Sequence, residues 1–263
     1  DVNRIYNSNY DILILNDKFI DPYSIPSNIK VIYGPQFFVF PSGPVVGPLK
    51  QDLVGRCAFN ILSTWVHDLY LEMAESIIMP LVPFPFAVDT DRFKPDLTSK
   101  TLDCVVYIKR RSKQLVDYTL NLLNEKKISY KAFTYGSYNE HDYLNTLRTA
   151  KFMLTLDAHE SQGFALEEAM SCDIPLLVVD AISMYDEMGD GYTSTYKHLH
   201  PKKLIAPSVP YWSDECGLKI IEQSEISSAI DTMMDKYSTF TPRQFIVKTL
   251  SNEVCMRRIL DYF

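Results

Sequence analysis

The distribution of apolar and polar residues divides most of the chain after residue 100 into short strands and longer helices. Apolar runs of strand length alternate with segments in which apolar residues recur at helical spacing. The predicted strands cover residues 103–108, 130–134, 152–157, 174–180, 203–206 and 217–221. The predicted helices cover residues 113–126, 139–150 and 224–236, with a further helix between Gly163 and Pro175. This regular alternation predicts an α/β fold built on a parallel sheet.

The beginning of the chain shows the same pattern with shorter elements. Its predicted elements are strands at residues 11–15 and 29–33, a helix at residues 63–73 and an extended, proline-rich connector at residues 77–86. At the other end of the chain, Thr241-Pro242 is a typical helix start. A single last helix is therefore predicted from Pro242 to about Tyr262.

Composition narrows the class of protein. The 263 residues are 46% hydrophobic and 22% charged, which is typical of a globular chain with one large domain or two smaller ones. A net charge of −7 argues against broad binding to nucleic acid or acidic membranes, so an anion site would have to be local. The sequence shows neither an apolar run of bilayer length nor a signal peptide, and no transmembrane segment is expected.

The cysteines indicate the compartment. There are five of them, an odd number, widely spaced and without a Cys-x-x-Cys pair. We expect buried free thiols rather than a disulfide framework or a zinc site. Free thiols are typical of a reducing environment, which predicts a cytoplasmic location.

Two glutamates bracket a predicted turn from strand to helix. Glu160 follows the strand at residues 152–157, Gly163 stands where the helix is expected to begin, and Glu168 lies inside that helix. In an open parallel sheet such a turn lies at the carboxyl ends of the strands, where ligands bind, and a helix N-terminus attracts phosphate. The two acids could hold a polyhydroxylated ligand at both ends. The alternative is an ordinary helix with two surface glutamates.

A cluster of positive charge follows the strand at residues 103–108. Four cations occur where the chain leaves the sheet, in the sequence Lys109-Arg110-Arg111-Ser112-Lys113. They are expected at the same edge of the sheet as Gly163. In an acidic protein this local excess predicts an acidic ligand, because Arg offers paired donors to phosphate and Lys a compact charge. A solvated basic turn is the alternative interpretation.

The sequence around the two glutamates resembles the donor site of an enzyme family. Glu160-x7-Glu168, with Gly-Phe between the acids and Glu-Ala-Met-x-Cys at the second, is similar to the motif of retaining GT-B glycosyltransferases (group 1, family 4-like). In that family the first Glu contacts the transferred sugar, the second binds the nucleotide ribose, and the amides between them hold the diphosphate. The resemblance gives these roles to Glu160, Glu168 and the amides of residues 162–165. Ala165 and Asp173 depart from the glycines that are usual at their positions.

The resemblance also implies roles for two neighbouring loops. The family places an Arg and a Lys after the first strand to neutralise the departing diphosphate, which fits Arg110 and Lys113, although Lys109 stands where Gly is usual. The loop after the next strand forms the nucleotide-base pocket. The expected catalytic residues are Glu160, Arg110 and Lys113. The expected donor-binding residues are Lys109, Arg111, Tyr135, Gly136, Tyr138, His159, Ser161, Gln162, Gly163, Phe164, Ala165 and Glu168.

A second resemblance concerns domain organisation. Residues 85–95 are similar to the interdomain linker of the same family, with its Gly/Ala-Val-Asp-x-x-x-Phe-x-Pro pattern. The implied architecture is an α/β GT-B fold, with two Rossmann-like parallel-sheet domains facing each other across a cleft. Residues 1–88 would form a small acceptor-side domain, either reduced or truncated, and residues 89–240 the nucleotide-sugar-binding domain. The helix in residues 241–263 would pack back on the first domain and bury Phe245, Ile246, Leu250 and Ile259.

The implied activity is transfer of a hexose or related sugar from a nucleotide-diphosphate sugar to an acceptor hydroxyl, with retention. Catalysis would rest on positioning and on stabilisation of the diphosphate, so neither a cofactor nor a metal is expected. The expected partners are the nucleotide-sugar donor and a glycan or other hydroxyl acceptor, with no nucleic acid. The protein would be cytoplasmic or peripheral to a membrane.

Three alternatives stay open. A non-catalytic sugar- or nucleotide-binding module would keep the phosphate site without turnover. A sugar–nucleotide epimerase or a phosphorylase could share the fold, although no lysine pocket for pyridoxal phosphate is recognisable. Finally, Asp89-Thr-Asp91 spells Asp-x-Asp, the metal–diphosphate motif of the GT-A glycosyltransferase fold. Because it lies between two proline-rich stretches, a solvated turn is the better interpretation.

Overall fold

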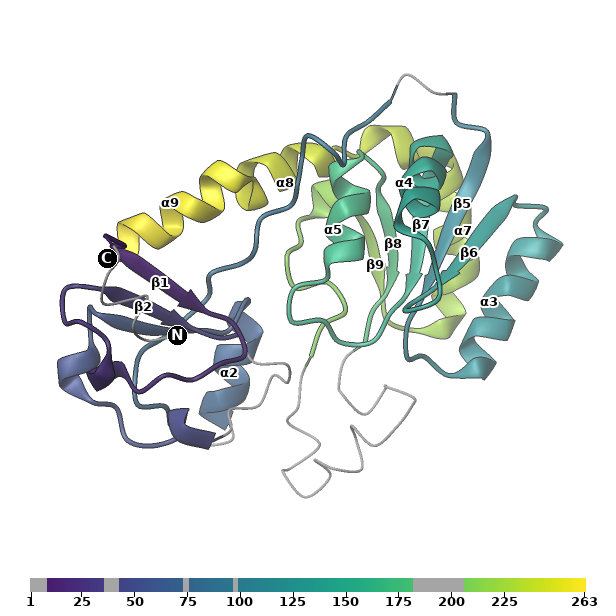
Figure 1. Ribbon diagram of the computed structural model, residues 1–263. Coiled ribbons are helices and arrows are strands. Elements are labelled where there is room, and N and C mark those ends of the chain that lie inside the picture. The colour runs from purple at the N-terminus through teal and green to yellow at the C-terminus, as the bar shows by residue number, and fades with distance from the viewer. Residues whose placement is uncertain (1–8, 36–42, 73–75, 97–98, 182–205) are drawn as a thin grey trace. The chain divides into compact units, whose positions relative to one another are not determined.

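The chain forms two compact units, each with its own sheet (Figure 1). The computed structural model describes residues 9–35, 43–72, 76–96, 99–181 and 206–263. The first unit consists of Asp1–Phe86 together with Cys255–Phe263, and the second of Ala87–Val254. All strands pair in parallel within both sheets, which confirms the predicted α/β fold class with two Rossmann-like sheets.

The first unit contains a four-stranded sheet in the order β1-β2-β3-β4. Its elements are β1 (Ile12–Leu15), β2 (Lys30–Tyr33), β3 (Cys57–Asn60), β4 (Leu81–Val82), α2 (Thr64–Glu72) and the 3-10 helices Pro22–Ser24, Gly43–Val45 and Gln51–Leu53. Strand β4 lies in the segment that was predicted as a mere connector. Proline cannot donate to a ladder, but its carbonyl still accepts, and Pro80 receives the Phe59 N–H at 2.8 Å. The two non-proline residues that follow complete a short edge strand.

Both faces of this sheet are covered. Alternate side chains of β2 and β3 point to opposite faces, so each strand contributes to two apolar clusters. The larger cluster includes Val31 and Phe59 with Val66 and Tyr70 of α2. The smaller cluster packs Ile32, Ala58 and Phe84 against the last residues of the chain, Ile259, Tyr262 and Phe263.

Asn60 fixes the point where β3 leaves the sheet. Its side chain is buried and donates to the carbonyl of Phe84 at 2.8 Å. Its amide oxygen accepts the N–H groups of Leu62 at 2.9 Å and Phe84 at 3.0 Å. One side chain therefore satisfies three backbone groups, as burial of polar groups requires.

The second unit contains a five-stranded sheet in the order β6-β5-β7-β8-β9 (Figure 1). Its strands are β5 (Leu102–Ile108), β6 (Tyr130–Thr134), β7 (Ala150–Leu156), β8 (Leu176–Val179) and β9 (Gly217–Ile220). Its α-helices are α3 (Lys113–Glu125), α4 (Glu140–Thr149), α5 (Phe164–Ser171), α7 (Ile226–Lys236) and α8 (Pro242–Leu250). Three 3-10 helices, Asp214–Cys216, Gln223–Glu225 and Tyr237–Thr239, complete the described elements. Between residues 102 and 181 and between residues 217 and 236, the predicted strands and helices are confirmed within two residues of their predicted bounds. The strand predicted at residues 203–206 lies almost entirely outside the described residues.

Helices cover this sheet on both sides, as the alternation of strands and helices predicts. One face packs Val106 and Leu154 against Leu123 of α3 and Ile230 of α7. On the other face, Tyr107 meets Tyr143 of α4 with ring centroids 6.4 Å apart. The chain runs from β5 to β6 on one side and then returns to β7 on the other side of β5. In such sheets ligands bind outside the carboxyl ends of the strands where the order reverses, which here is between β5 and β7.

The single last helix predicted from the sequence is wrong. Two helices occur instead, α8 and α9 (Asn252–Tyr262), and Ser251 between them is extended, with φ −67° and ψ 159°. Serine is a favoured first residue at the start of a helix, and its extended backbone ends α8. Within this part of the chain Ile246 and Leu250 are buried, whereas Phe245 and Ile259 are half-buried.

Two further sequence predictions have a direct outcome. All five cysteines are buried and free, as predicted. In the described ranges, no helix is both long and apolar enough to cross a membrane.

Candidate functional site

The carboxyl edge of the second sheet brings together the loops after β5, β6 and β7. Strand β5 ends at Ile108 and β7 at Leu156, and these two residues are paired in the ladder. The next residues along the chain, Lys109 and Asp157, therefore leave the sheet side by side, where the strand order reverses. The predicted cluster of cations and the predicted glutamate turn share this edge.

Lys109 and Glu160 form an ion pair at the centre of the edge. Their side chains are only 11% and 16% exposed, so the pair is largely shielded from water. The Lys109 ammonium group also lies 4.4 Å from the ring centroid of Tyr135, in the loop after β6. Burial disfavours the charge of Lys109, but the carboxyl groups of Glu160 and Asp157 outweigh it and raise the Lys109 pKa.

Asp157 is a second acid at the same point, and the sequence analysis did not select it. Its side chain is fully buried, and Oδ1 accepts the N–H of Ala158 at 2.7 Å. Oδ2 has no hydrogen-bond partner within the described ranges. Burial, and then the charge of Glu160, raise the pKa of Asp157 well above its usual value, while the charge of Lys109 acts in the opposite direction. The polar residue that ends an apolar strand was the only sequence signal for it.

Arg111 and Ser208 hold the backbone beneath this group. The Arg111 guanidinium donates to the carbonyl oxygens of Asp157 at 2.8 Å and Val179 at 2.9 Å, and so ties the ends of β7 and β8 together. The Ser208 hydroxyl, which is buried, donates to the same Asp157 oxygen at 3.1 Å. Arg111, predicted as a donor-binding residue, thus has a bracing position under the loop. Ser208 is remote in sequence from every motif and was missed.

The turn before α5 carries most of the predicted phosphate ligands. Gly163 caps the helix with φ 94° and ψ 53°, a left-handed conformation that glycine adopts without strain. A Cβ atom at this position would lie 3.5 Å from Glu160 Cβ, which is ordinary contact, so backbone conformation rather than space favours glycine. His159 and Gln162 are buried, Ser161 and Ala165 are half-buried, and Phe164 is exposed.

Glu168 lies one helical turn further along α5 and is half-buried. Its pKa is raised to about 7, mainly by burial and further by the negative charge of Glu140. Arg92 acts in the opposite direction, but it is itself bound to Glu140 through a 2.6 Å ion pair. Glu168 therefore changes charge near neutral pH.

Other predicted residues lie at the rim of the edge or in the core. Lys113 begins α3, is 86% exposed and pairs with Asp117 one turn along the same helix at 2.5 Å. Arg110 is exposed at a positive φ of 51°. Tyr135 is 55% exposed and Gly136 is exposed beside it. The ring of Tyr138 packs instead in an aromatic cluster, 5.6 Å from Phe133 and 5.1 Å from Tyr143 between centroids.

Helix α5 is anchored at both ends. Near its start, the Tyr143 hydroxyl donates to the Ala165 carbonyl at 2.5 Å. At its end, the Arg243 guanidinium donates to the Ser171 carbonyl at 2.6 Å and also to the carbonyls of Phe93 and Thr90. The segment that contains Asp89-Thr-Asp91 is thereby fixed as a turn, in which Asp89 accepts the Arg92 N–H at 3.1 Å.

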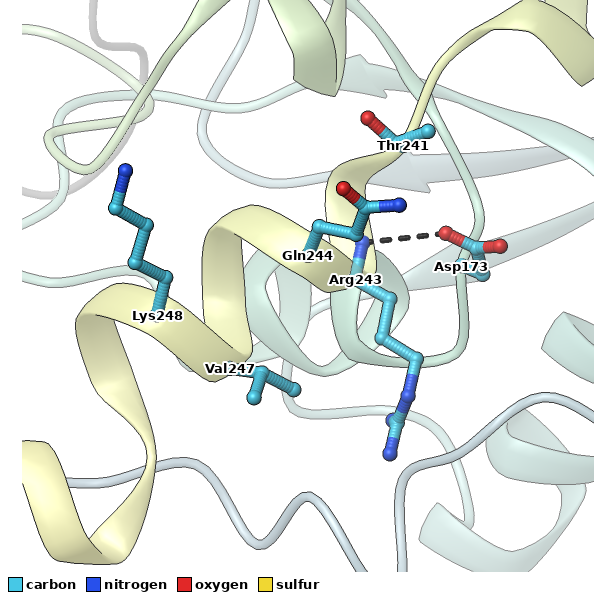
Figure 2. A pocket seen from close by; sticks show the side chains of 6 residues that line it. All are labelled: Asp173, Thr241, Arg243, Gln244, Val247 and Lys248. Carbon is cyan, nitrogen blue, oxygen red and sulfur yellow. Dashed lines mark hydrogen bonds between the residues drawn. The ribbon is translucent and has the colours of Figure 1, made fainter.

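An open pocket of ≈ 480 Å³ lies at the start of α8 (Figure 2). It is lined by Asp173, Thr241, Arg243, Gln244, Val247 and Lys248. Asp173 follows the C-terminal end of α5, and its carboxylate accepts the Arg243 N–H at 3.2 Å. The pocket thus lies at the opposite end of α5 from Gly163, and it contains no residue of the predicted donor site.

No protein-family model matches the sequence, and neither does any curated protein. Solved structures are nevertheless similar in fold. The chain matches TarM of S. aureus with a TM-score of 0.57 and 12% identity, over 99% of this chain and 57% of TarM. It matches the pneumococcal O-GlcNAc transferase GtfA with a TM-score of 0.54 and 9% identity, over 99% of this chain and 58% of GtfA. It matches sucrose-phosphate synthase from Thermosynechococcus elongatus with a TM-score of 0.51 and 13% identity, over 78% of this chain and 57% of the synthase.

The chain has the GT-B fold. At identities of 9–13% the similarity to these GT-B proteins concerns the fold. The chain also spans less than two thirds of the length of each of the three. The roles of single residues, like the roles of the two domains, stay predictions.

Proposed function

We propose that the protein is a glycosyltransferase that moves a sugar from a nucleotide-diphosphate donor to an acceptor hydroxyl, with retention and without a metal ion. One observation carries the proposal: Lys109, Glu160 and the N-terminal turn of α5 meet at the carboxyl edge of a parallel sheet where its strand order reverses. That place suits a phosphorylated ligand, because a cation and the positive end of a helix dipole both favour negative charge.

The proposed roles follow the chemistry of each group. The amides of residues 162–165 would hold the diphosphate, and Lys109 and Arg110 would neutralise the charge that it gains as it leaves. Lys113 would have to release Asp117 to contribute. Glu160 would orient the sugar hydroxyls, and Glu168, when ionised, would accept hydrogen bonds from the ribose.

The Lys109–Glu160 ion pair implies an exchange of partners during binding. An arriving diphosphate competes with Glu160 for the Lys109 ammonium group, which turns the Glu160 carboxylate into an acceptor for sugar hydroxyls. Phosphate and sugar binding would thus be coupled through one short contact. Retention and the hydroxyl acceptor belong to the same proposal and rest on the resemblance of the Glu160-x7-Glu168 segment. The proposed cytoplasmic location rests on the five free cysteines.

Calorimetric titration with UDP, GDP, ADP and TDP, each with and without EDTA, tests the donor site. UDP is the first nucleotide to try, since GtfA is described in complex with UDP and GlcNAc. Binding of one nucleotide that persists in EDTA and is weakened in Glu168→Ala is expected. Glu125→Gln, an exposed change at the end of α3, is the matched control and should bind as the wild type does. No binding of any nucleotide by the wild type would refute the proposal.

A non-catalytic binding module is the second candidate, because the Lys109–Glu160 pair and the N-terminal turn of α5 could hold a nucleotide sugar without turnover. Incubation with the matching nucleotide sugar separates the two functions. Transfer to an acceptor, or slow release of free sugar, supports an enzyme, whereas tight binding with an intact donor over many hours supports the module.

A further inference from the structure

Glu167 is a fully buried acid that none of the proposed roles uses. It lies in the first turn of α5, next to Glu168, and its side chain is 0% exposed. Its Oε2 accepts a hydrogen bond of 3.0 Å from the side-chain amide of Gln162, which is itself only 2% exposed. Its Oε1 has no hydrogen-bond partner, and its carboxyl group has no ion-pair partner, in the part of the chain that the structure describes.

An ionised carboxylate is costly in such a place. A buried charge is tolerated when a cation or several donors surround it, and here a single amide group is the partner. Burial raises the pKa of Glu167 well above its usual value, and the nearby charges of Glu160 and Glu168 raise it further. The neutral acid is the form that fits this environment.

The hydrogen bond between Glu167 and Gln162 links the first turn of α5 to the loop that precedes it. The N–H groups of Glu167 and Leu166 both bond to the carbonyl of Gly163, at 3.0 Å each. The side-chain contact joins the same segment from the other direction, because Gln162 immediately precedes Gly163. Backbone and side chain together form a closed loop from residue 162 to residue 167, and Gly163 lies inside it.

We propose that Glu167 is a positioning residue that, as a neutral carboxylic acid, holds Gln162 and thereby fixes the turn that receives the donor diphosphate. This inference rests on the proposed function for its effect on ligand binding. Ionisation of Glu167 would place a negative charge beside the phosphate-binding amides, where Glu160 and Glu168 are already acidic and Lys109 is engaged with Glu160. Nucleotide affinity therefore falls on the alkaline side, and Glu167→Gln, which cannot ionise, removes that fall.

Three variants test the proposal in the full chain. Glu167→Gln keeps a neutral group that can accept from Gln162, Glu167→Leu keeps the volume but removes the contact, and Glu125→Gln is the exposed control. The first measurement needs no ligand. Carboxyl ¹³C shifts, assigned by the signal that disappears in Glu167→Gln, should show Glu167 protonated at pH 7. Hydrogen exchange at the amide of Leu166 should be about tenfold faster in Glu167→Leu and unchanged in Glu167→Gln.

The second measurement is nucleotide affinity between pH 7 and pH 10. Glu167→Leu removes one buried hydrogen bond and should therefore weaken nucleotide binding about tenfold at pH 7. The melting temperature of this variant should stay close to that of the wild type. Glu167→Gln should bind as the wild type does at pH 7 and lose less affinity toward pH 10. Titration of the nucleotide itself is common to all variants and cancels in the comparison.

Either of two results would overturn the proposal: a Glu167 carboxyl that is ionised at pH 7, or a Glu167→Leu variant with wild-type exchange and wild-type affinity. If the wild type binds no nucleotide, the proposed donor site fails instead. The carboxyl titration and the exchange rates then still decide whether Glu167 fixes the turn, so the two failures remain distinguishable.

Discussion

The charge of Glu168 should control nucleotide-sugar binding near neutral pH. Its pKa of about 7 means that the Glu168 carboxylate, which we propose as the ribose ligand, is present in only part of the molecules at that pH. A protonated acid offers one acceptor oxygen fewer and no charge to strengthen the hydrogen bonds. Because the acid form dominates below the pKa, affinity should rise as the pH increases from 6 to 8.

The size of the effect follows from the pKa. With a midpoint of about 7, roughly 9% of Glu168 is ionised at pH 6 and roughly 91% at pH 8. If the ribose hydroxyls bind the ionised form alone, the apparent affinity scales with that fraction. The dissociation constant should therefore fall about tenfold across this range, which corresponds to about 1.4 kcal/mol.

Isothermal titration with a nucleotide-diphosphate sugar measures this directly. The sugar ester is preferable to the free nucleotide, since a terminal phosphate titrates with a pKa of about 6 and would mask the effect. Glu168→Gln should bind with a nearly flat pH profile. Glu140→Gln should move the midpoint to lower pH, because the charge of Glu140 raises the Glu168 pKa. A flat profile in the wild type, or an equal slope in Glu168→Gln, would refute the assignment.

Three further predictions concern stability, and urea or thermal unfolding followed by circular dichroism checks each of them. Lys109→Met should cost about 3 kcal/mol by leaving Glu160 without its cation, and adding Glu160→Gln should restore part of the loss; additive losses would contradict a paired role. Asn60→Leu should cost about 3 kcal/mol because three buried backbone groups lose their partner, so a change below about 1 kcal/mol would be inconsistent with the network. Gly217→Ala should be much more damaging than Gly163→Ala, which should cost about 1–2 kcal/mol for its left-handed backbone. A Cβ on Gly217 would lie 2.0 Å from a backbone oxygen of β8, and equal effects of the two changes would argue against this close strand contact.

The sequence predicted the second sheet well because its elements differ in period and length. Strands such as residues 130–134 are short continuous apolar runs, and helices such as residues 139–150 carry apolar residues on one face, so neighbouring elements cannot be confused. The prediction of secondary structure was poorer where two different structures are compatible with the same spacing of apolar residues. Residues 242–262 keep a helical spacing throughout, and nothing in that spacing marks the extended residue Ser251. Strand β4 is only two residues long, too short for any periodicity.

The candidate site was predictable where it depends on position along a strand or helix. Gly163 and the cations after β5 follow from the rule that loops after parallel strands share one edge. Which cation reaches Glu160 was not predictable, because Lys109 and Lys113 differ only in how the chain turns after Ile108. The burial of two acidic side chains could also not be predicted from the sequence pattern. Asp157 and Glu167 are both buried, whereas the chemical identity of an acid alone predicts exposure.

The double anchorage of α5 has a consequence for the thermodynamics of recognition. Tyr143 holds its first turn and Arg243 its last residue before any ligand arrives. An anion at the first turn would meet amides that are already ordered, so the entropy lost on binding would belong mainly to the ligand. Amides that are already ordered could bind a phosphate group without the base and ribose of a nucleotide. Inorganic phosphate or sulfate should then compete for the same amides, and the choice of buffer would influence every affinity measured for this protein.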